Sequence, residues 1–264
     1  MIIDSHTHLG KNDATPERLL ESMKRSGTDY ALIIAGESFS KTLPSTEELI
    51  EMVKPHKNLF AIAAASPFNI SATRLNELES YIKSGKVKGI KLFPGYEHYY
   101  APDERLTGVY ELSLRFNIPI IFHTGLLWDP EKKGLIKYSN PLAIDEVATK
   151  FPDLKIVIAH MGNPWAEDCA AVVYKNKNIY VDISGFFTDF GGPFPKEEKN
   201  SFLAYIEKIG GIVDNLKQRM LYGTDWPLCD MKEYVKIASA IKLTPEEREL
   251  LFWKNAANLF NLSV

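Results

Sequence analysis

The sequence predicts an α/β protein built as a single (β/α)8 TIM barrel with an extra helix at its C-terminal end. Eight short apolar runs alternate with helical patterns along the chain, which is typical of parallel strands covered by helices. Several runs end in a histidine or an aspartate, and (β/α)8 barrels gather functional side chains at such strand ends. Because 264 residues with 45% hydrophobic content can bury one large core, we expect residues 1–264 to form one domain.

The eight predicted strands are rich in Ile, Val, Leu and Ala, and the segments between them are long enough for a helix and two loops. They comprise residues 2–8, 29–36, 59–66, 87–94, 118–125, 155–162, 179–185 and 219–227. A doubly wound open sheet is the alternative fold. It would need a Gly-rich phosphate turn after the first strand, where this chain has Ser5-His6-Thr7-His8 instead.

Helix-start signals occur between the predicted strands. Thr15 before Pro16 is an N-cap followed by proline at the first helical position, and Ser45 with Glu48 has the spacing of a capping box. Thr244 before Pro245 begins a last helix that we expect to run through residue 260. This helix is predicted to close the far end of the barrel.

Composition narrows the class of protein and of partner. The formal charge of −3, with both signs interspersed and no Lys/Arg run, argues against a nucleic-acid partner. Cys169 and Cys229 are the only cysteines, which excludes a disulfide scaffold and fits a reducing compartment. No apolar stretch approaches the roughly 20 residues of a membrane span, and the histidines near residue 1 leave no room for a signal peptide. We therefore expect a cytoplasmic protein.

Five metal-type residues lie at the ends of apolar runs. His6 and His8 are two positions apart on the first strand, so both imidazoles point to the same side. Two histidines on an exposed edge strand would show the same spacing. The edge-strand interpretation is less favoured because His123, His160 and Asp225 lie at the ends of other predicted strands. A catalytic metal site combines ligands of this kind and keeps one coordination position open.

Short motifs at these strand ends resemble one enzyme family. In chain order they are IIDSHTH, GIKLFPGY, IIFHTG, IVIAHMG, YGTDWP and WKNAANLF. The chain resembles the amidohydrolase superfamily, and within it the amidohydrolase-related branch that includes aminocarboxymuconate-semialdehyde decarboxylase. The resemblance implies a metal centre with His6, His8, His123 and Asp225 as ligands. It also implies that His160 is the sixth-strand histidine that contacts the metal-bound water or the substrate.

The expected chemistry follows from these residue types. A divalent ion lowers the pKa of its bound water, and Asp225 has a second oxygen with which to accept that water's proton as general base and return it as general acid. His160 would orient the water or polarise a carbonyl. The alternative for His160 is a core histidine bonded to a backbone carbonyl. Asp4, on the first strand, is predicted to be structural.

Lys91 lies among apolar residues at the end of the fourth predicted strand, and three interpretations compete. The one we favour is a free ammonium that binds a substrate carboxylate. The second is a carboxylated lysine that bridges two metals, as in binuclear members of the superfamily. The third is a structural lysine paired with Glu37 or Glu97.

We expect one divalent ion, or two if Lys91 is carboxylated. Histidine and carboxylate ligands without thiolate fit Zn²⁺, Mn²⁺, Fe²⁺ and Co²⁺ almost equally, and zinc comes first only on the family resemblance.

Two long loops, residues 126–139 and 186–198, are expected to shape the substrate site and to act as lids. Trp128 in the first loop and Trp226 near the end of the last predicted strand are predicted to contact a small, planar or cyclic substrate. The same aromatic side chains are compatible with packing of the barrel rim or with a homodimer interface.

The sequence therefore predicts a metal-dependent hydrolase whose metal-activated water attacks an amide, ester or lactone carbonyl of a small, carboxylated cyclic substrate. The alternative is a non-oxidative decarboxylase (carboxy-lyase) of the same branch. A TatD-type nuclease would need an acidic ligand on the fourth strand, where this chain has Lys91, and a basic rim. A barrel that only binds or scaffolds would have lost metal-type residues, and all are retained.

Overall fold

The computed structural model describes residues 1–10, 13–37, 40–129, 131–187 and 194–264. Its strands are parallel neighbours in one eight-stranded sheet, in the order in which they occur along the chain. They are β1 (Ile3–Thr7), β2 (Tyr30–Ile34), β3 (Leu59–Ala64), β4 (Val87–Leu92), β5 (Ile120–Phe122), β6 (Ile156–Ile158), β7 (Ile179–Asp182) and β8 (Met220–Leu221). Each lies inside one of the eight predicted runs.

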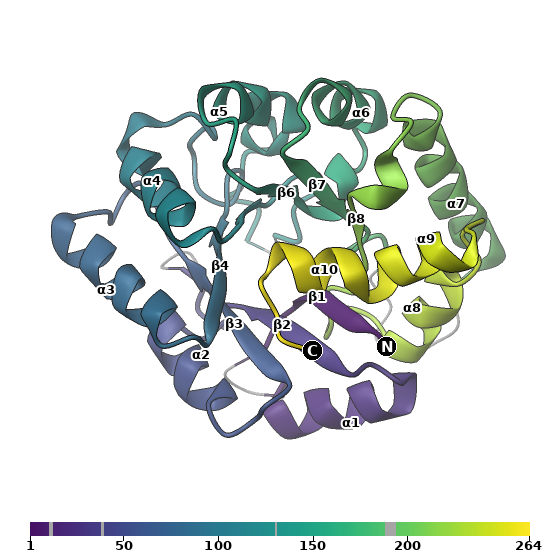
Figure 1. The fold of residues 1–264 in the computed structure, drawn as a ribbon, viewed down its shortest axis with the longest axis horizontal. Helices are drawn as coiled ribbons and strands as arrows, with labels where there is room; N and C mark the ends of the chain where they lie inside the picture. The colour runs from purple at the N-terminus through teal and green to yellow at the C-terminus, as the bar shows by residue number, and fades with distance from the viewer. Residues whose placement is uncertain (11–12, 38–39, 130, 188–193) are drawn as a thin grey trace.

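The sheet closes between its first and last strands. The backbone N–H of Ser5 donates to the carbonyl of Tyr222 at 2.9 Å, and that of His8 donates to the carbonyl of Trp226 at 2.7 Å. In Figure 1 the strands form the centre and the helices a ring around them. The predicted (β/α)8 barrel is confirmed, and its strands are buried on both faces by neighbouring strands and helices.

Ten α-helices alternate with the strands or follow them in the described residues. They are α1 (Pro16–Ser26), α2 (Thr46–Val53), α3 (Ala72–Lys83), α4 (Thr107–Phe116), α5 (Ile144–Lys150), α6 (Ala166–Lys175), α7 (Lys196–Gly210), α8 (Met231–Ala238), α9 (Pro245–Glu249) and α10 (Asn255–Leu259). The predicted caps are confirmed: Thr15 caps α1 with Pro16 in its first turn, and Ser45 and Glu48 form a capping box at α2.

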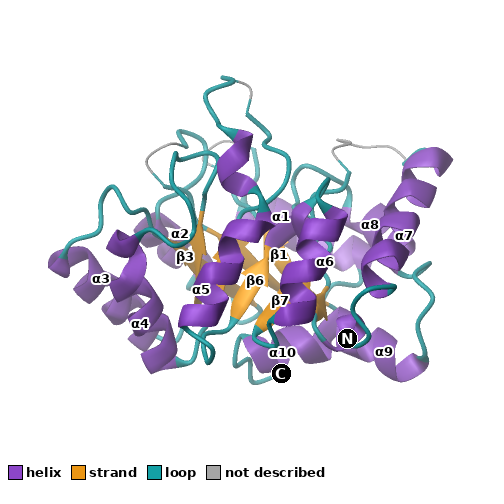
Figure 2. Ribbon diagram, turned by 90° about the horizontal axis from the view of Figure 1, so that it is seen from above, coloured by secondary structure: helices purple, strands orange, loops and turns teal. Residues whose placement is uncertain are grey.

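The C-terminal segment begins with the predicted cap and lies at the predicted end of the barrel. Thr244 caps α9, and a π-helical turn, Leu250–Lys254, joins α9 to α10. The Asn255 side-chain amide donates to the carbonyl of Met220, at the start of β8, at 2.8 Å. Figure 2 shows α9 and α10 opposite the long loops that follow the strands. The C-terminal ends of the strands, on the side of the long loops, are therefore not covered by this segment and can form a functional site.

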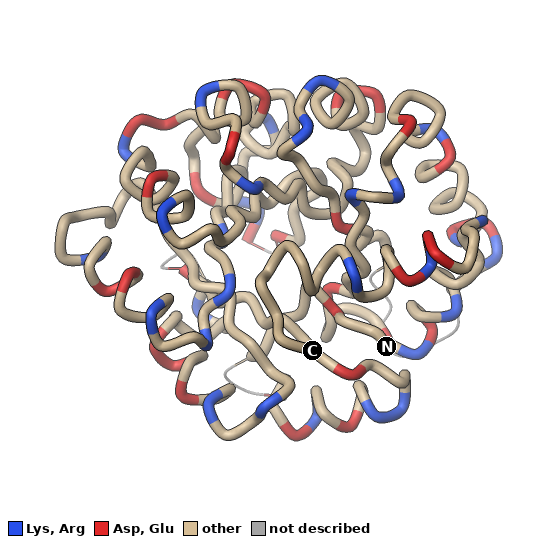
Figure 3. Tube along the Cα trace, in the orientation of Figure 1, with Lys and Arg blue, Asp and Glu red and all other residues tan. Residues whose placement is uncertain are grey.

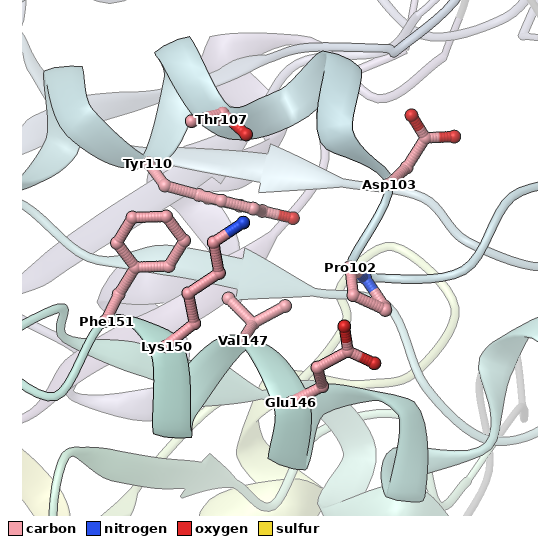
Figure 4. A pocket seen from close by; sticks show the side chains of 8 residues that line it. All are labelled: Pro102, Asp103, Thr107, Tyr110, Glu146, Val147, Lys150 and Phe151. Carbon is pink, nitrogen blue, oxygen red and sulfur yellow. The ribbon is translucent and has the colours of Figure 1, made fainter.

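The outer surface mixes charges of both signs over the helices, as Figure 3 shows. Each helix in the described part of the chain is too short or too polar to cross a membrane. Figure 4 shows a cavity between α4 and α5 of about 10 Å³, lined by residues that include Tyr110 and Lys150. It has room for about one water molecule and lies within the helix layer.

Glu97, in the loop after β4, is a buried carboxyl group with a raised pKa. Ser66 donates to its Oε1 at 2.6 Å, and its Oε2 has no hydrogen-bond partner among the described residues. Burial raises the pKa of Glu97 to about 7, and the nearby charge of Glu37, itself 3.6 Å from Arg74, adds to the increase. The folded protein thus keeps a proton that the unfolded chain releases above roughly pH 4.3. Its contribution to stability must fall as the pH rises from there to about 7.

We expect Glu97→Gln to raise the melting temperature relative to the wild type more at about pH 8 than at about pH 5, because glutamine cannot ionise. Calorimetry at both pH values measures the difference. Glu111→Gln, at an exposed position, is the matched control. Its melting temperature should differ from that of the wild type by the same small amount at both pH values. An offset for Glu97→Gln that does not depend on pH would refute the buried-proton interpretation.

Candidate metal centre

Three of the four predicted ligands come together at the C-terminal end of the barrel. The Nε2 atom of His8 lies 3.2 Å from Oδ1 of Asp225, and that of His6 lies 3.6 Å from the same oxygen. Their ligand atoms are all within 4.8 Å of one another. The two histidines leave β1 on one side, as the alternation of the strand predicts. This spacing is suited to a single cation.

The backbone around Asp225 holds this geometry. Its N–H donates to the carbonyl of His6 at 2.8 Å, and its φ of 68° is in the left-handed region. The carboxylate of Asp4 accepts hydrogen bonds from the N–H of His6 at 3.1 Å and from the N–H and hydroxyl of Thr224, at 3.1 and 2.6 Å. Asp4 thus ties β1 to the loop after β8, in agreement with its predicted structural role.

His123 and His160 extend the cluster. The ring of His160 lies 4.8 Å from that of His6 and 5.1 Å from that of His123. The Nε2 atom of His123 is buried without a hydrogen-bond partner among the described residues. Tyr96 packs edge-on against His123 at 4.7 Å. His123 lies beside the three-ligand group rather than within it.

His160 occupies a strained turn after β6. Its φ is 58° and that of Met161 is 47°, both in the left-handed region that non-glycine residues seldom adopt. Gly185 makes room for the ring, because a Cβ there would lie 2.4 Å from Nδ1 of His160. Local backbone strain of this kind is common at functional sites.

The imidazoles of His6, His123 and His160 are neutral. Burial, and then the charge of Lys91, lower the pKa of His6 to about 3 against the opposing effect of Asp182. Burial also lowers the pKa of His123, where His160 and Lys91 add to the effect, and that of His160. Neutral imidazole is the form that binds a metal.

Asp225 is anionic among these neutral rings. Burial alone would raise the pKa of its carboxyl group, but the hydrogen bond from His8 and the proximity of His6 hold it well below its usual range. One carboxylate, neighbouring imidazoles and the unpartnered Nε2 of His123 make a nitrogen and oxygen donor set that fits a divalent cation.

Lys91 is 1% exposed, and its ammonium group has no hydrogen-bond partner in the described part of the chain. Burial lowers the pKa of Lys91 to about 8, although Asp182 and Asp225 oppose the shift. The predicted alternative of pairing with Glu37 or Glu97 is wrong. Glu97 instead accepts a hydrogen bond from Ser66, and Glu37 lies 3.6 Å from Arg74 of α3, so each carboxylate is held by a side chain other than Lys91.

Asp182 and Ser184, at the end of β7, are buried polar residues that sequence reasoning missed. Asp182 lies 2.9 Å from Nδ1 of His6, and the hydroxyl of Ser184 lies 2.9 Å from Nδ1 of His160. Burial would raise the pKa of Asp182, but the proximity of His6 and the hydrogen bond from its Nδ1 hold it well below its usual range. One sequence feature could have identified Asp182. It is a carboxylate at the end of an apolar run, and that run forms the strand next to the one that precedes His160.

The two predicted substrate contacts lie in different environments. Trp226 is 6% exposed and follows Asp225 directly. Trp128 is 54% exposed, and its backbone N–H donates to the hydroxyl of Tyr96 at 2.9 Å. The N–H of Leu135 donates to the carbonyl of Gly95 at 2.8 Å, so the loop after β5 is tied to the loop after β4 at both ends. Part of the second predicted lid, residues 188–193, lies outside the described residues.

The protein is a (β/α)8 barrel, and histidines and a carboxylate lie together at the C-terminal ends of its strands. This combination is typical of barrel enzymes with a divalent-metal centre. A sequence profile of the Amidohydrolase family matches residues 3–262. The chain belongs to the amidohydrolase family, as its motifs predicted.

Individual proteins are similar to this chain at low sequence identity. Gamma-resorcylate decarboxylase from Polaromonas sp. is 26% identical over 134 residues, which cover 43% of this chain and 36% of that protein. An uncharacterised TIM-barrel protein from Bordetella bronchiseptica superposes with a TM-score of 0.78 at 20% identity, over 98% of both chains. Two further solved structures superpose with a TM-score of 0.74 over 99% of both chains. They are a probable 2-pyrone-4,6-dicarboxylic acid hydrolase from Acinetobacter baumannii with bound citric acid, at 15% identity, and an amidohydrolase from Burkholderia multivorans with bound zinc, at 16%.

Proposed function

We propose that this protein is a metal-dependent hydrolase that acts on the carbonyl of a small cyclic substrate bearing a carboxylate. The observation that carries the proposal is the position of Lys91. Its buried ammonium has no hydrogen-bond partner among the described residues, lies 5.5 Å from the centre of the Phe93 ring, and is close enough to Asp225 for the two charges to interact. A buried cation without a hydrogen-bonded counter-ion is costly unless a ligand supplies one. A substrate carboxylate is the complementary group.

The ion would be held by His6, His8 and Asp225, with His123 as the fourth ligand through its unpartnered Nε2. A bound divalent ion supplies Lewis acidity and lowers the pKa of water beside it. Zinc is the first candidate, because the amidohydrolase from Burkholderia multivorans holds it on the same fold.

Three side chains would carry out the remaining work. Asp225 accepts the proton of the attacking water and returns it to the leaving group. His160, buried beside His6 and His123, orients the water or the substrate carbonyl. Lys91 fixes the orientation of the ring by binding its carboxylate, which is worth more in a site shielded from water than at the surface.

The same lysine favours hydrolysis over decarboxylation. In decarboxylation the carboxylate loses its charge as CO2 leaves, so an ammonium bound to it stabilises the ground state more than the transition state. In hydrolysis the substrate carboxylate takes no part in the reaction, so its ion pair with Lys91 is the same in the ground state and in the transition state.

The second candidate is a decarboxylase of an aromatic carboxylic acid. It is favoured by the 26% identity over 134 residues to gamma-resorcylate decarboxylase. In that case Lys91 would bind a different polar group, and the departing carboxylate would lie nearer the histidine cluster.

The discriminating experiment offers zinc-loaded protein two planar substrates, 2-pyrone-4,6-dicarboxylate and gamma-resorcylate, in isotopically labelled water. Chelator-sensitive incorporation of labelled oxygen into an opened ring supports the hydrolase. Release of CO2 without incorporation supports the decarboxylase. Binding of zinc without turnover of these compounds or of any carboxylated lactone, ester or amide would count against both.

Lys91→Met tests whether Lys91 binds the carboxylate of the substrate. We expect KM for the carboxylated substrate to rise roughly 10- to 100-fold, the value of a charge-assisted hydrogen bond, with a smaller change in kcat. The melting temperature should rise by a few degrees, because the variant removes a buried charge.

Lys88→Met, on the same strand, is the control, since Lys88 packs over the ring of Phe60 at 5.4 Å, outside the metal cluster. It should leave KM unchanged. An unchanged KM in Lys91→Met would remove the lysine from substrate binding.

A further inference from the structure

The carboxylate of Asp182 joins two histidines from different strands. Its Oδ1 accepts hydrogen bonds from the N–H of His160 at 2.9 Å, from the N–H of Ser184 at 3.1 Å, and from the hydroxyl of Ser184. Its Oδ2 lies 2.9 Å from Nδ1 of His6. The side chain is almost completely buried, so each of these contacts forms away from water.

These contacts determine which nitrogen of His6 carries its proton. An ionised carboxylate only accepts hydrogen bonds, so the Nδ1 atom facing Asp182 must be the donor. Ser184 Oγ also lies 3.1 Å from this Nδ1, but its single hydrogen is engaged with Oδ1 of Asp182. His6 therefore carries its proton on Nδ1 and has a lone pair on Nε2, the atom that faces Asp225.

The same reasoning determines the tautomer of His160. Its Nδ1 lies 2.9 Å from Oγ of Ser184 and 3.2 Å from the carbonyl of Ser184. The carbonyl is only an acceptor, and the hydroxyl has already donated its hydrogen to Asp182. The Nδ1 atom of His160 is thus also the protonated one, and its Nε2 has a free lone pair.

We propose that Asp182 is the positioning residue of the metal centre: it fixes His6 as the Nδ1–H tautomer, while the backbone carbonyl of Ser184 holds His160 in the same form. Both Nε2 lone pairs are then available at the barrel mouth. A ligating histidine that donates its other N–H to a carboxylate is held in orientation and binds its metal more strongly. This inference rests on the proposed role of His6 as a ligand.

Asp182→Asn provides a specific test, because the surroundings dictate how the amide must turn. Three donors converge on Oδ1, so the amide oxygen takes that position and the NH2 group takes the position of Oδ2. The NH2 group then donates to Nδ1 of His6 and forces the proton to Nε2, where it blocks ligation. His160 keeps its tautomer, since its contacts to Ser184 are unchanged.

Two readouts follow from this design. Zinc affinity, measured on the full-length protein by competition with a chromophoric chelator, should fall roughly 10- to 100-fold in Asp182→Asn. The second readout is nitrogen NMR of the imidazole rings, recorded on full-length protein from which a chelator has removed the metal. His6 should be in the Nδ1–H form in the wild type and in the Nε2–H form in Asp182→Asn, while His160 has the same form in both.

Ser184→Ala is the matched control. It leaves the contact between Asp182 and His6 intact, and the backbone carbonyl still accepts from His160, so both tautomers and the zinc affinity should stay near those of the wild type.

Wild-type zinc affinity in Asp182→Asn, or an Nε2–H tautomer of His6 in the chelated wild type, would overturn the proposal. The wild-type spectrum decides the question even if Asp182→Asn fails to fold. A wild type that binds no zinc would refute the proposed function, while the tautomer of His6 still decides this inference separately.

Discussion

Asp225→Asn is expected to lower turnover roughly 100- to 10,000-fold, the contribution of a positioned general acid or base. The variant removes a charged ligand and the proposed proton acceptor in one step, while the volume of the side chain stays the same. The Nε2 atoms of His6 and His8, at 3.6 and 3.2 Å, would face a neutral amide.

The fold should survive this substitution. Residue 225 has a φ of 68°, and asparagine is among the few non-glycine residues that adopt this region readily. The backbone bond from residue 225 to the carbonyl of His6 does not involve the carboxylate. A melting temperature close to that of the wild type is therefore expected.

The measurement is kcat for the zinc-loaded protein, with zinc content determined on the same sample to separate lost metal from lost proton transfer. Asp230→Asn is the control, since Asp230 caps α8, where asparagine caps equally well. Activity of Asp225→Asn within a few-fold of the wild type would refute the mechanism.

His123→Ala is expected to lose bound metal, and His160→Ala to retain most of it, if the centre holds one ion. The Nε2 atom of His123 is buried and has no partner among the described residues, so it is available as a ligand. His160 is bonded to Ser184 through its Nδ1, and its proposed role is to orient the water or the substrate carbonyl rather than to hold the ion.

Metal per chain is measured by elemental mass spectrometry, on protein purified without chelators or a histidine tag and with bicarbonate present. About one equivalent is expected for the wild type, as in catalytic zinc sites. His98→Ala is the control, because His98 bonds the carbonyl of Lys133 in the outer loops. Equal metal loss from His123→Ala and His160→Ala, with about two equivalents in the wild type, would instead favour a binuclear site with carboxylated Lys91.

The sequence by itself determined the features that depend on neighbouring residues. Caps such as Thr15 and Ser45 act within one helical turn, and the alternation of a strand puts His6 and His8 on one side, so a few residues suffice to predict each. The eight apolar runs could be recognised because a strand buried on both faces must be apolar. With all the strands parallel, the polar residues at their ends had to meet at one face.

Only the tertiary structure decided how these residues are paired. Asp182 bonds His6 across 176 positions of sequence. Lys91 has no hydrogen-bonded acidic partner among the described residues, and Glu37 and Glu97 contact other side chains. The left-handed backbone at His160 occurs together with a hydrogen bond from its N–H to Asp182. Contacts of this kind form between strands only when the barrel closes, and their geometry depends on packing that is not encoded in local spacing.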